Sequence, residues 1–342
     1  MANLSEIAAK LNLNVSVVSR ALNPNPDKNA VVRKETCDLI RRTAQEMGYR
    51  PNRQASFLKK GKSPTILCFL PDVPNDLIAD LMFGISETAC HENFPVNFLF
   101  GSKPEDFGRF LKEAENAGHS GILSYPPQKM PEEIRREAEA YTARGGKMLF
   151  LNVTSNTPGF GELPEEFKKT PQLNIDDYYG CSLVAKHFLD QGCEEFYWYN
   201  PESSYLKARA AGFSMPLLKA GCSVRELDES VLEKVFENKK RTGIFAIHDG
   251  FALHLFQRML KSGVIPGNRI LLAGFNDLRF CAQLKPGLTT VHQPMRQEGM
   301  TAVQKLIRMI FGGKEKNETL KPYLVIRAST NINEKTNGGI IQ

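Results

Sequence analysis

Apolar runs alternate with helical patterns along most of the chain, and this alternation limits the possible folds more than any other sequence feature. The runs cover residues 65–70, 96–100, 121–124, 147–151, 196–199, 243–247 and 269–273. The helical patterns cover residues 78–91, 105–117, 132–144, 180–191, 208–220, 251–262 and 298–311. Such alternation predicts parallel sheets flanked by helices. Because this region is too long for one open sheet of average size, we expect two α/β lobes. A small-ligand cleft is expected between them, at the carboxyl ends of the strands.

Positive charge is concentrated before the first of these strands. Residues 1–62 hold 12 lysines and arginines against 5 aspartates and glutamates, whereas the rest of the chain holds 32 against 33. A small basic head on a neutral body is the electrostatic pattern of a nucleic-acid-binding protein. Charge alone also allows a merely solvated basic surface, so the argument depends on how the head folds.

The head reads as three short helices. Leu4, Ile7, Ala8 and Leu11 share one helical face, and Asn3 with Glu6 predicts a capping box at its start. After a tight connection, Asn14 can cap a second helix. Two short helices joined by about three residues predict a helix-turn-helix, whose second helix enters the major groove of DNA. A third helix is expected over 34–47, with Leu39, Ile40, Ala44 and Met47 inward and Gly48 ending it.

Three segments of the head resemble the DNA-binding domain of the LacI/GalR family of bacterial transcriptional repressors. They read Leu4-Ser5-Glu6-Ile7-Ala8, Val15-Ser16-Val17-Val18-Ser19-Arg20-Ala21-Leu22-Asn23 and Met47-Gly48-Tyr49-Arg50-Pro51-Asn52. Their order and spacing match the family except between Asn23 and Glu35, where this chain is longer. We interpret the extra residues, 24–28, as a surface loop near the DNA backbone.

The resemblance assigns DNA contacts to the second helix. It implies that Val15 and Ser16 read base edges and that Arg20 lies near the operator centre. Arg can bond guanine O6 and N7, Ser can donate or accept, and Val can touch a thymine methyl group. Phosphate contacts are implied for three flanking polar residues. These are Asn14, Ser19 and Asn23.

Residues 52–58 are similar to the family's hinge helix, which is helical on DNA. Leu58 matches the leucine that wedges into the minor groove, and an apolar wedge with basic flanks is how architectural proteins kink DNA. Arg53, Ala55 and Lys59 are the other DNA contacts expected here. Phe57 is an unusual choice beside Leu58, and we expect it to alter the wedge or to pack on the dimer mate.

The resemblance continues through the body. Its blocks are Leu70-Pro71-Asp72 with Asn75, Asp176-Asp177-Tyr178 with Gly180, Arg209-Ala210-Ala211-Gly212-Phe213, Gly274-Phe275-Asn276-Asp277, Leu288-Thr289-Thr290-Val291-His292-Gln293-Pro294 and Val325-Ile326-Arg327-Ala328-Ser329-Thr330. The implied fold is an all-α helix-turn-helix head, joined by a hinge helix to an α/β, periplasmic-binding-protein-like, two-lobed effector domain. The implied domains are a head (1–50), a hinge (51–62), a ligand-binding and dimerisation domain (63–331) and a tail (332–342).

The same blocks suggest the effector site. The expected ligand contacts are Asp72, Asn75, Asp176, Arg209, His248 and Asn276. The guanidinium of Arg209 suits paired sugar hydroxyls or a carboxylate. His248 and Asn276 stand where the family usually has Asn and Asp, and the loss of a carboxylate removes a strong acceptor for sugar hydroxyls. A sugar or sugar derivative is the expected effector, with the subsidiary hypothesis that it is not a simple neutral sugar. For His248, a structural hydrogen-bonded role is equally open.

The expected function is therefore a sequence-specific DNA-binding regulator, most simply a repressor. We expect a homodimer on a pseudo-palindromic operator, with operator affinity changed by a small effector. A non-sugar effector or a protein partner is the alternative. A solute receptor would need a signal peptide and no basic head, and an enzyme would need a nucleophile–base pair or a metal set, neither of which the motifs suggest.

Composition agrees with this expectation. Hydrophobic residues make up 42% and charged residues 24%, which excludes a disordered chain or a coiled-coil rod. The seven cysteines lack any C-x-x-C pair, so reduced thiols are expected and a zinc site is not. No apolar run is long enough to span a membrane and residues 1–10 lack an apolar core, so we expect a cytoplasmic protein without a cofactor.

Overall fold

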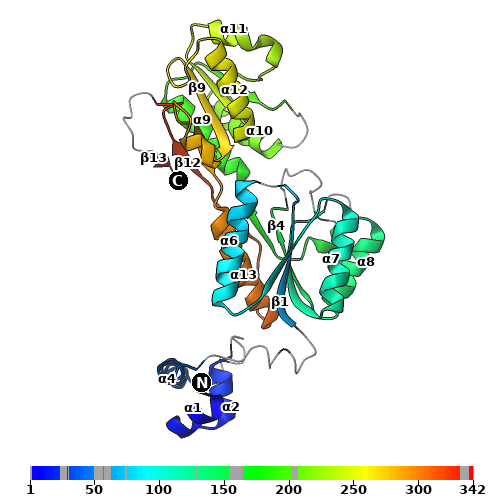
Figure 1. The fold of residues 1–342 in the computed structure, drawn as a ribbon. Helices are drawn as coiled ribbons and strands as arrows, with labels where there is room; N and C mark the ends of the chain where they lie inside the picture. The colour runs from blue at the N-terminus through cyan, green and yellow to red at the C-terminus, as the bar shows by residue number, and fades with distance from the viewer. Residues whose placement is uncertain are drawn as a thin grey trace.

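A helical head and two α/β lobes make up the molecule (Figure 1). The computed structural model describes residues 2–23, 29, 31–49, 57, 63–73, 75–127, 130–153, 163, 165–201, 207–331 and 339–341. In Figure 1 the head is dark blue, and the lobes run from the lighter blue of β1 through cyan, green and yellow to red. The expected fold class is confirmed: all-α at the amino end, then α/β.

The head consists of α1 (Leu4–Leu11), α2 (Val15–Ala21) and α4 (Lys34–Glu46). The predicted capping box is present, because the Asn3 side chain accepts from the Glu6 backbone N–H and the Glu6 carboxylate accepts from the Asn3 backbone N–H. Ile7, Val18 and Ile40 are fully buried where the three helices meet. Leu39 was expected inward but is 44% exposed, because it lies about 100° around the helix from Ile40.

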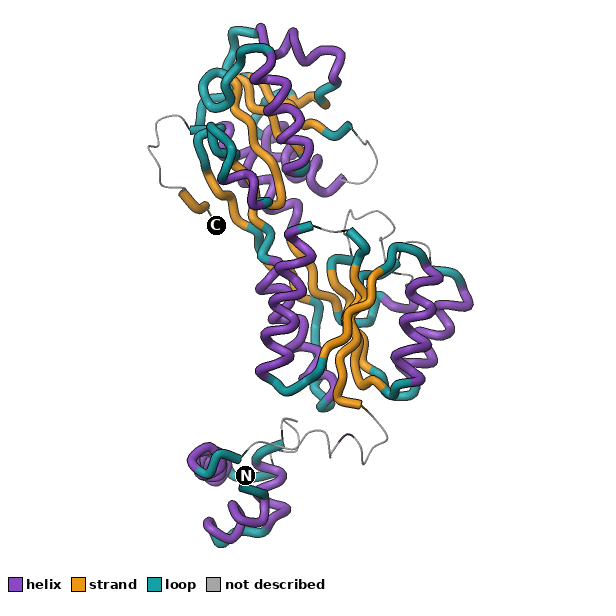
Figure 2. Tube along the Cα trace, viewed as in Figure 1, coloured by secondary structure: helices purple, strands orange, loops and turns teal. Residues whose placement is uncertain are grey.

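The first lobe contains a parallel six-stranded sheet in the order β11-β5-β4-β3-β1-β2. Its strands are β1 (Ser63–Leu70), β2 (Val96–Phe100), β3 (His119–Ser124), β4 (Lys147–Leu151), β5 (Gln172–Ile175) and β11 (Glu318–Leu320). Its helices are α6 (Asp76–His91), α7 (Pro104–Asn116), α8 (Glu132–Ala143) and α13 (Met295–Ile310). Figure 2 shows α6 and α13 on one face of this sheet and α7 and α8 on the other. Both faces are therefore covered, which explains why its strands read as continuous apolar runs.

The second lobe contains a seven-stranded sheet in the order β13-β12-β10-β9-β8-β6-β7. Its strands are β6 (Glu195–Tyr199), β7 (Val224–Glu226), β8 (Thr242–Ala246), β9 (Ile270–Asn276), β10 (Thr289–His292), β12 (Tyr323–Ile326) and β13 (Gly339–Ile341). Its helices are α9 (Asp177–Asp190), α10 (Lys207–Lys219), α11 (Leu232–Glu237) and α12 (Asp249–Lys261). Among the described strands of this sheet, β12 pairs antiparallel with both β10 and β13, and the other neighbouring pairs are parallel. Strand β13 comes from the segment expected to be a tail.

The chain passes between the lobes three times, so neither lobe is one continuous segment. It leaves the first lobe between β5 and α9, returns between β10 and α13, and leaves again between β11 and β12. The returning helix α13 packs directly on α6. A Cβ on Gly84 would stand 2.0 Å from the Arg296 carbonyl oxygen, and one on Gly299 would stand 2.4 Å from the Leu81 carbonyl oxygen. Two glycines therefore allow these helix backbones to approach closely.

The long elements match the sequence prediction to within a few residues. The short strands β5, β7, β10, β11 and β13 and the short helix α11 were not predicted, because three to six residues give too little periodicity to recognise. No helix in the described part of the chain is long and apolar enough to cross a membrane.

Candidate functional site

The outer surface of α2 is the first candidate site. The Asn14 side chain accepts from the Ser16 backbone N–H at 2.9 Å and so fixes the start of the helix. Val18 and Ala21 hold the opposite face in the core of the head. Val15 is 42% exposed, and Ser16, Ser19 and Arg20 are exposed as well. Val15, Ser16, Ser19 and Arg20 therefore form two adjacent rows, i and i+4, on one open helix surface. Asn14 lies just before this helix, and Asn23, which is half-buried, lies just after it.

The hinge contains the other predicted DNA contacts. Arg53, Ala55, Leu58 and Lys59 lie outside the described residues. Phe57 is described, and its ring is only 6% exposed. It packs against Phe94 at 5.9 Å and Phe311 at 6.1 Å between ring centroids. Phe57 thus contacts its own first lobe, which differs from the expected alteration of the wedge or contact with a dimer mate.

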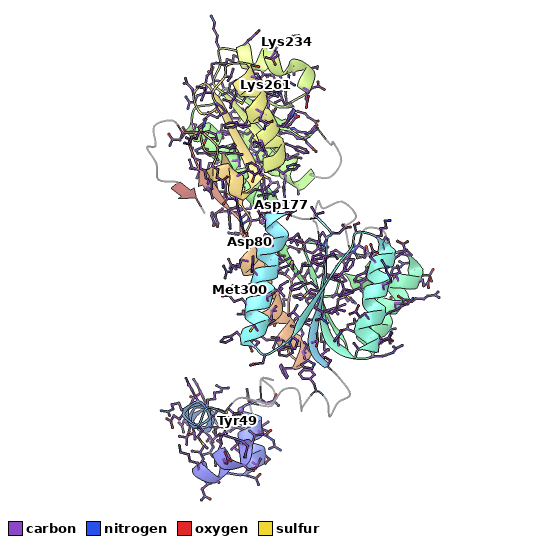
Figure 3. All side chains as sticks on the ribbon, viewed as in Figure 1. Tyr49, Asp80, Asp177, Lys234, Lys261 and Met300 are labelled. Carbon is purple, nitrogen blue, oxygen red and sulfur yellow. The ribbon has the colours of Figure 1, made fainter. Side chains whose placement is uncertain are left out.

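Arg209 is the centre of the second candidate site, at the edge of the second lobe. Its Nε donates to Asp177 Oδ2 at 2.8 Å, and its Nη1 donates to the Ile247 carbonyl at 2.8 Å. The guanidinium carbon lies 3.8 Å from the centroid of the Phe275 ring. The arginine is 8% exposed, and these contacts fix its planar group in one orientation. Figure 3 labels Asp177 where the two lobes meet.

Asn276 faces Arg209 from the end of β9. Its Oδ1 accepts from Arg209 Nη1 at 3.4 Å and from Gln293 Nε2 at 2.7 Å. Its φ of 120° lies in the region that favours glycine, so the surrounding structure holds the residue in a strained conformation. Such strain is typical of residues that are positioned for function.

Two carboxylates, those of Asp249 and Asp277, form hydrogen bonds around the end of β9. Burial opposes ionisation of Asp277, but hydrogen bonds from His292 and Arg327 hold its pKa below the ordinary value. Asp249 is fully buried, and burial raises its pKa to about 7 although Thr290 and the Leu278 backbone N–H donate to it. These groups stabilise the loop after β9.

The other predicted effector contacts mainly cap helices. Asn75 caps α6 through the Ile78 N–H, and Asp176 caps α9 through the Tyr179 N–H. His248 Nδ1 accepts from the Phe251 N–H, and the two rings stack at 3.6 Å between centroids. Burial and the charge of Arg209 lower the pKa of His248 to about 4. Asp72 is exposed and accepts from Ser102 Oγ at 3.4 Å. All four follow a strand of the central sheets. Their contact with a ligand stays a prediction.

Three further residues form a polar cluster that the sequence analysis missed. The Asn152 amide donates to the Tyr125 hydroxyl at 2.7 Å and to Glu298 Oε2 at 3.0 Å. Glu298 is fully buried in the first turn of α13. Burial raises its pKa to about 8, a hydrogen bond from Asn152 lowers it in part, and the charge of Asp177 raises it again. These residues lie far apart in sequence, so no spacing pattern could have identified them.

The second site offers hydrogen-bond donors and acceptors. Arg209 and Gln293 supply N–H groups, and Asn276 and Glu298 supply oxygens. Within the described residues, no group of three or more His, Cys, Asp and Glu side chains could hold a metal ion. This arrangement suits recognition of a small polar molecule.

Comparison with known proteins adds an independent result. Residues 185–330 match the model of the periplasmic binding protein-like domain family. The HTH-type transcriptional repressor PurR of Photobacterium profundum is 23% identical, over 96% of this chain and 98% of its own length. A solved lac repressor dimer, bound to operator and the anti-inducer ONPF, has a TM-score of 0.63 and 22% identity, over 96% of this chain and 99% of that one. A LacI family regulator from Enterococcus faecium with bound ribose has a TM-score of 0.63 and 22% identity, over 78% of this chain and 98% of that one.

Proposed function

We propose that the chain is a transcriptional regulator of the LacI/GalR family that binds operator DNA and represses transcription. The observation that carries the proposal is the surface of α2. Val15, Ser16 and Arg20 stand exposed on a helix whose start is fixed by Asn14 and whose other face is buried. A short capped helix of this kind fits the major groove with its first residues toward the base edges.

Two copies of the chain act together in this proposal. A homodimer places two heads on a pseudo-palindromic operator, because protein two-fold symmetry is matched by operator symmetry. Leu58 and its basic neighbours, from both hinges, would enter the minor groove at the operator centre. The lac repressor solved with operator DNA is a dimer, which supports this arrangement.

A small effector bound between the lobes would modulate DNA affinity. Arg209 and Asn276 are the contacts we propose from the second lobe, with Asp72, Asn75, Asp176 and His248 contributing where strands end. The Enterococcus faecium relative contains ribose, which supports a sugar or sugar derivative as the ligand class. An effector that closes the lobes would change the hinge through a coupling free energy, typically about 1–3 kcal/mol.

The proposed domains are the head (1–50), the hinge (51–62), the two-lobed regulatory domain (63–331) and the tail (332–342). The relatives are regulators rather than enzymes, and we propose no catalytic activity. Because a bacterial regulator acts on chromosomal DNA, we propose that it works in the cytoplasm.

Selection from random-sequence DNA tests the operator proposal directly. We expect the full chain to enrich a pseudo-palindromic sequence, and fluorescence anisotropy then measures its affinity. Arg20→Ala should weaken binding to that sequence by roughly 10- to 100-fold, the cost of one bidentate arginine–guanine contact. Weak, salt-sensitive binding to unrelated DNA should remain.

Lys10→Ala is the matched control. Lys10 is an exposed cation on α1 that pairs with Glu46 at 4.0 Å, so its removal lowers the charge of the head equally. We expect it to change the affinity only slightly and equally for all sequences. Failure to enrich any sequence, or an unchanged operator affinity of Arg20→Ala, would refute the proposal.

A further inference from the structure

Glu298 is a buried acid that lacks a cation partner among the described residues. Its side chain is 0% exposed in the first turn of α13. Asn152 donates to Oε2 at 3.0 Å, but Oε1 has no hydrogen-bond partner within the part of the chain that the structure describes. No described ion pair includes Glu298, whereas the buried Lys305 on the same helix pairs with Glu315 and Glu318. A buried polar atom without a partner is rare in native proteins and requires an explanation.

The neighbours of Glu298 place it beside the effector site proposed above. Tyr125 follows β3 and Asn152 follows β4, so both stand at the carboxyl ends of adjacent parallel strands. This edge is where open α/β sheets bind ligands. The charge of Asp177 acts on both Glu298 and Tyr125, and Asp177 in turn holds Arg209 of the second lobe. The cluster therefore lies on the first-lobe side of the contact between the lobes, within range of the charge of Asp177.

The chemistry of the cluster specifies what is missing. A carboxylate only accepts hydrogen bonds, and an ammonium group donates three and accepts none. A cation near Oε1 would supply the missing donor and the missing charge together. A buried carboxylate is stabilised when it is paired and hydrogen-bonded, and Asn152 already supplies one of the hydrogen bonds.

We propose that Glu298, Asn152 and Tyr125 form a subsite for a primary ammonium group, and that the effector is an amino sugar. The sugar hydroxyls would meet Arg209 and Asn276 across the lobes, and the ammonium group would donate to Glu298 Oε1. This inference rests on the proposed function, because it assigns the chemistry of the same effector site. Burial raises the pKa of the Glu298 carboxyl, whereas a bound ammonium group would lower it again, so any proton that the carboxyl holds passes to solvent as the ammonium group binds.

Matched pairs of sugars test the proposal on the full chain. The probes are glucosamine with glucose, galactosamine with galactose and mannosamine with mannose, each at 10-fold steps of concentration at pH 7. We expect at least one amino sugar to raise the melting temperature, because a ligand that binds only the folded state stabilises it. Its neutral parent should bind at least about 10-fold more weakly, in line with loss of a charge-assisted hydrogen bond.

Variants then link the effect to the cluster. Glu298→Gln should weaken amino-sugar binding at least about 10-fold in calorimetry, and it should weaken binding of the neutral parent much less. Asn152→Ala is a second variant in case the first one folds poorly, and it should weaken the same ligand. Glu87→Gln is the control, since Glu87 is an exposed acid on α6 that pairs with Arg296 at 2.8 Å. It should bind like the wild type.

Three results would overturn the inference. The first is that no amino sugar of the three raises the melting temperature of the wild type. The second is that a neutral parent binds as tightly as its amino sugar, and the third is that a folded Glu298→Gln variant retains wild-type affinity. Operator selection uses no effector, so a protein that binds its operator but fails these tests refutes only the amino-sugar assignment.

Discussion

The ring of Phe57 meets the ring of Phe311 edge-on, with 6.1 Å between centroids and 61° between the ring planes. Phe311 caps the carboxyl end of α13, and Glu298 lies in the first turn of the same helix. A helix of this length spans about 24 Å. One rigid element therefore has a buried acid of the proposed effector site near its start and the anchor of the hinge at its end.

Removing the Phe57 ring should loosen the hinge without unfolding the lobes. Phe57→Ala loses the edge contacts with Phe94 and Phe311, so the linker should open more often. We expect trypsin to cut between Arg50 and Lys62 at least about threefold faster in the absence of DNA. Mass spectrometry of the fragments measures this rate. Phe57→Leu, which keeps an apolar side chain, should be cut nearly as slowly as the wild type; equal rates for the wild type and Phe57→Ala would contradict the anchoring role.

Leu58 should act differently from its neighbour. An apolar wedge stabilises bent operator DNA without reading bases, so Leu58→Ala should weaken operator binding but leave half-site preference unchanged. We expect the operator affinity to fall roughly 10-fold. Unstacking a base step involves a few kcal/mol, and the alanine side chain should lose only part of the contact that stabilises the unstacked step. Anisotropy on the selected operator and on half-site variants measures both quantities. A changed half-site preference would mean that Leu58 is not a central wedge.

The Asp177–Arg209 pair should be important for the stability of the second lobe. Asp177→Asn leaves a buried guanidinium without its carboxylate, and breaking a buried pair costs about 3 kcal/mol. Urea unfolding of the two proteins measures the difference. Asp190→Asn, at an exposed position on the same helix, should change the free energy of unfolding by less than about 0.5 kcal/mol. Similar stabilities for both variants would show that Asp177 is not needed to hold Arg209.

Glu298 should make the free protein less stable as pH rises. Its pKa is about 8 in the folded chain, well above the ordinary glutamate value, so the folded state binds this proton more tightly than the unfolded state does. The contribution is fully present below the unfolded pKa and is lost as pH rises toward 8, at up to about 1.4 kcal/mol per pH unit. Glu298→Gln removes this loss.

The measurement is the difference between the free energies of unfolding of the wild type and of Glu298→Gln at several pH values. Between pH 5 and 8, Glu298→Gln should become more stable relative to the wild type, and the difference should change little above pH 8. The difference isolates Glu298 from Asp249, whose pKa is also raised and which is present in both proteins. A difference that stays constant with pH would show that Glu298 does not titrate as a buried acid.

Local chemistry explains which parts of the fold could be predicted. The capping box of Asn3 and Glu6 and the cap at Asn14 are formed by neighbours in sequence, so the head could be read from its residues. The long strands were predictable because both faces of the sheets are covered and the strands are apolar throughout. Leu39 shows the limit of such patterns. Each short helix of the head buries only a narrow face, so an apolar residue at the edge of that face can be exposed, as Leu39 is.

The sites were predictable only where a local motif carries them. Arg209 and Asn276 were identified from family blocks, and the structure brings them together. Glu298 was missed because the fold, and not sequence spacing, joins it to Asn152 across 146 positions. An acid inside an amphipathic helix pattern also reads as a solvent-facing residue, so only burial reveals its role.

The return of α13 to the first lobe has a consequence for synthesis on the ribosome. Ala302, Val303 and Leu306 are fully buried in the core of that lobe, yet they are made after nearly the whole second lobe. At bacterial elongation rates this delay is on the order of 10 s. The nascent first lobe therefore has one sheet face covered by α6 alone until α13 is made, and chaperones that bind apolar surface have a defined interval in which to act on this chain.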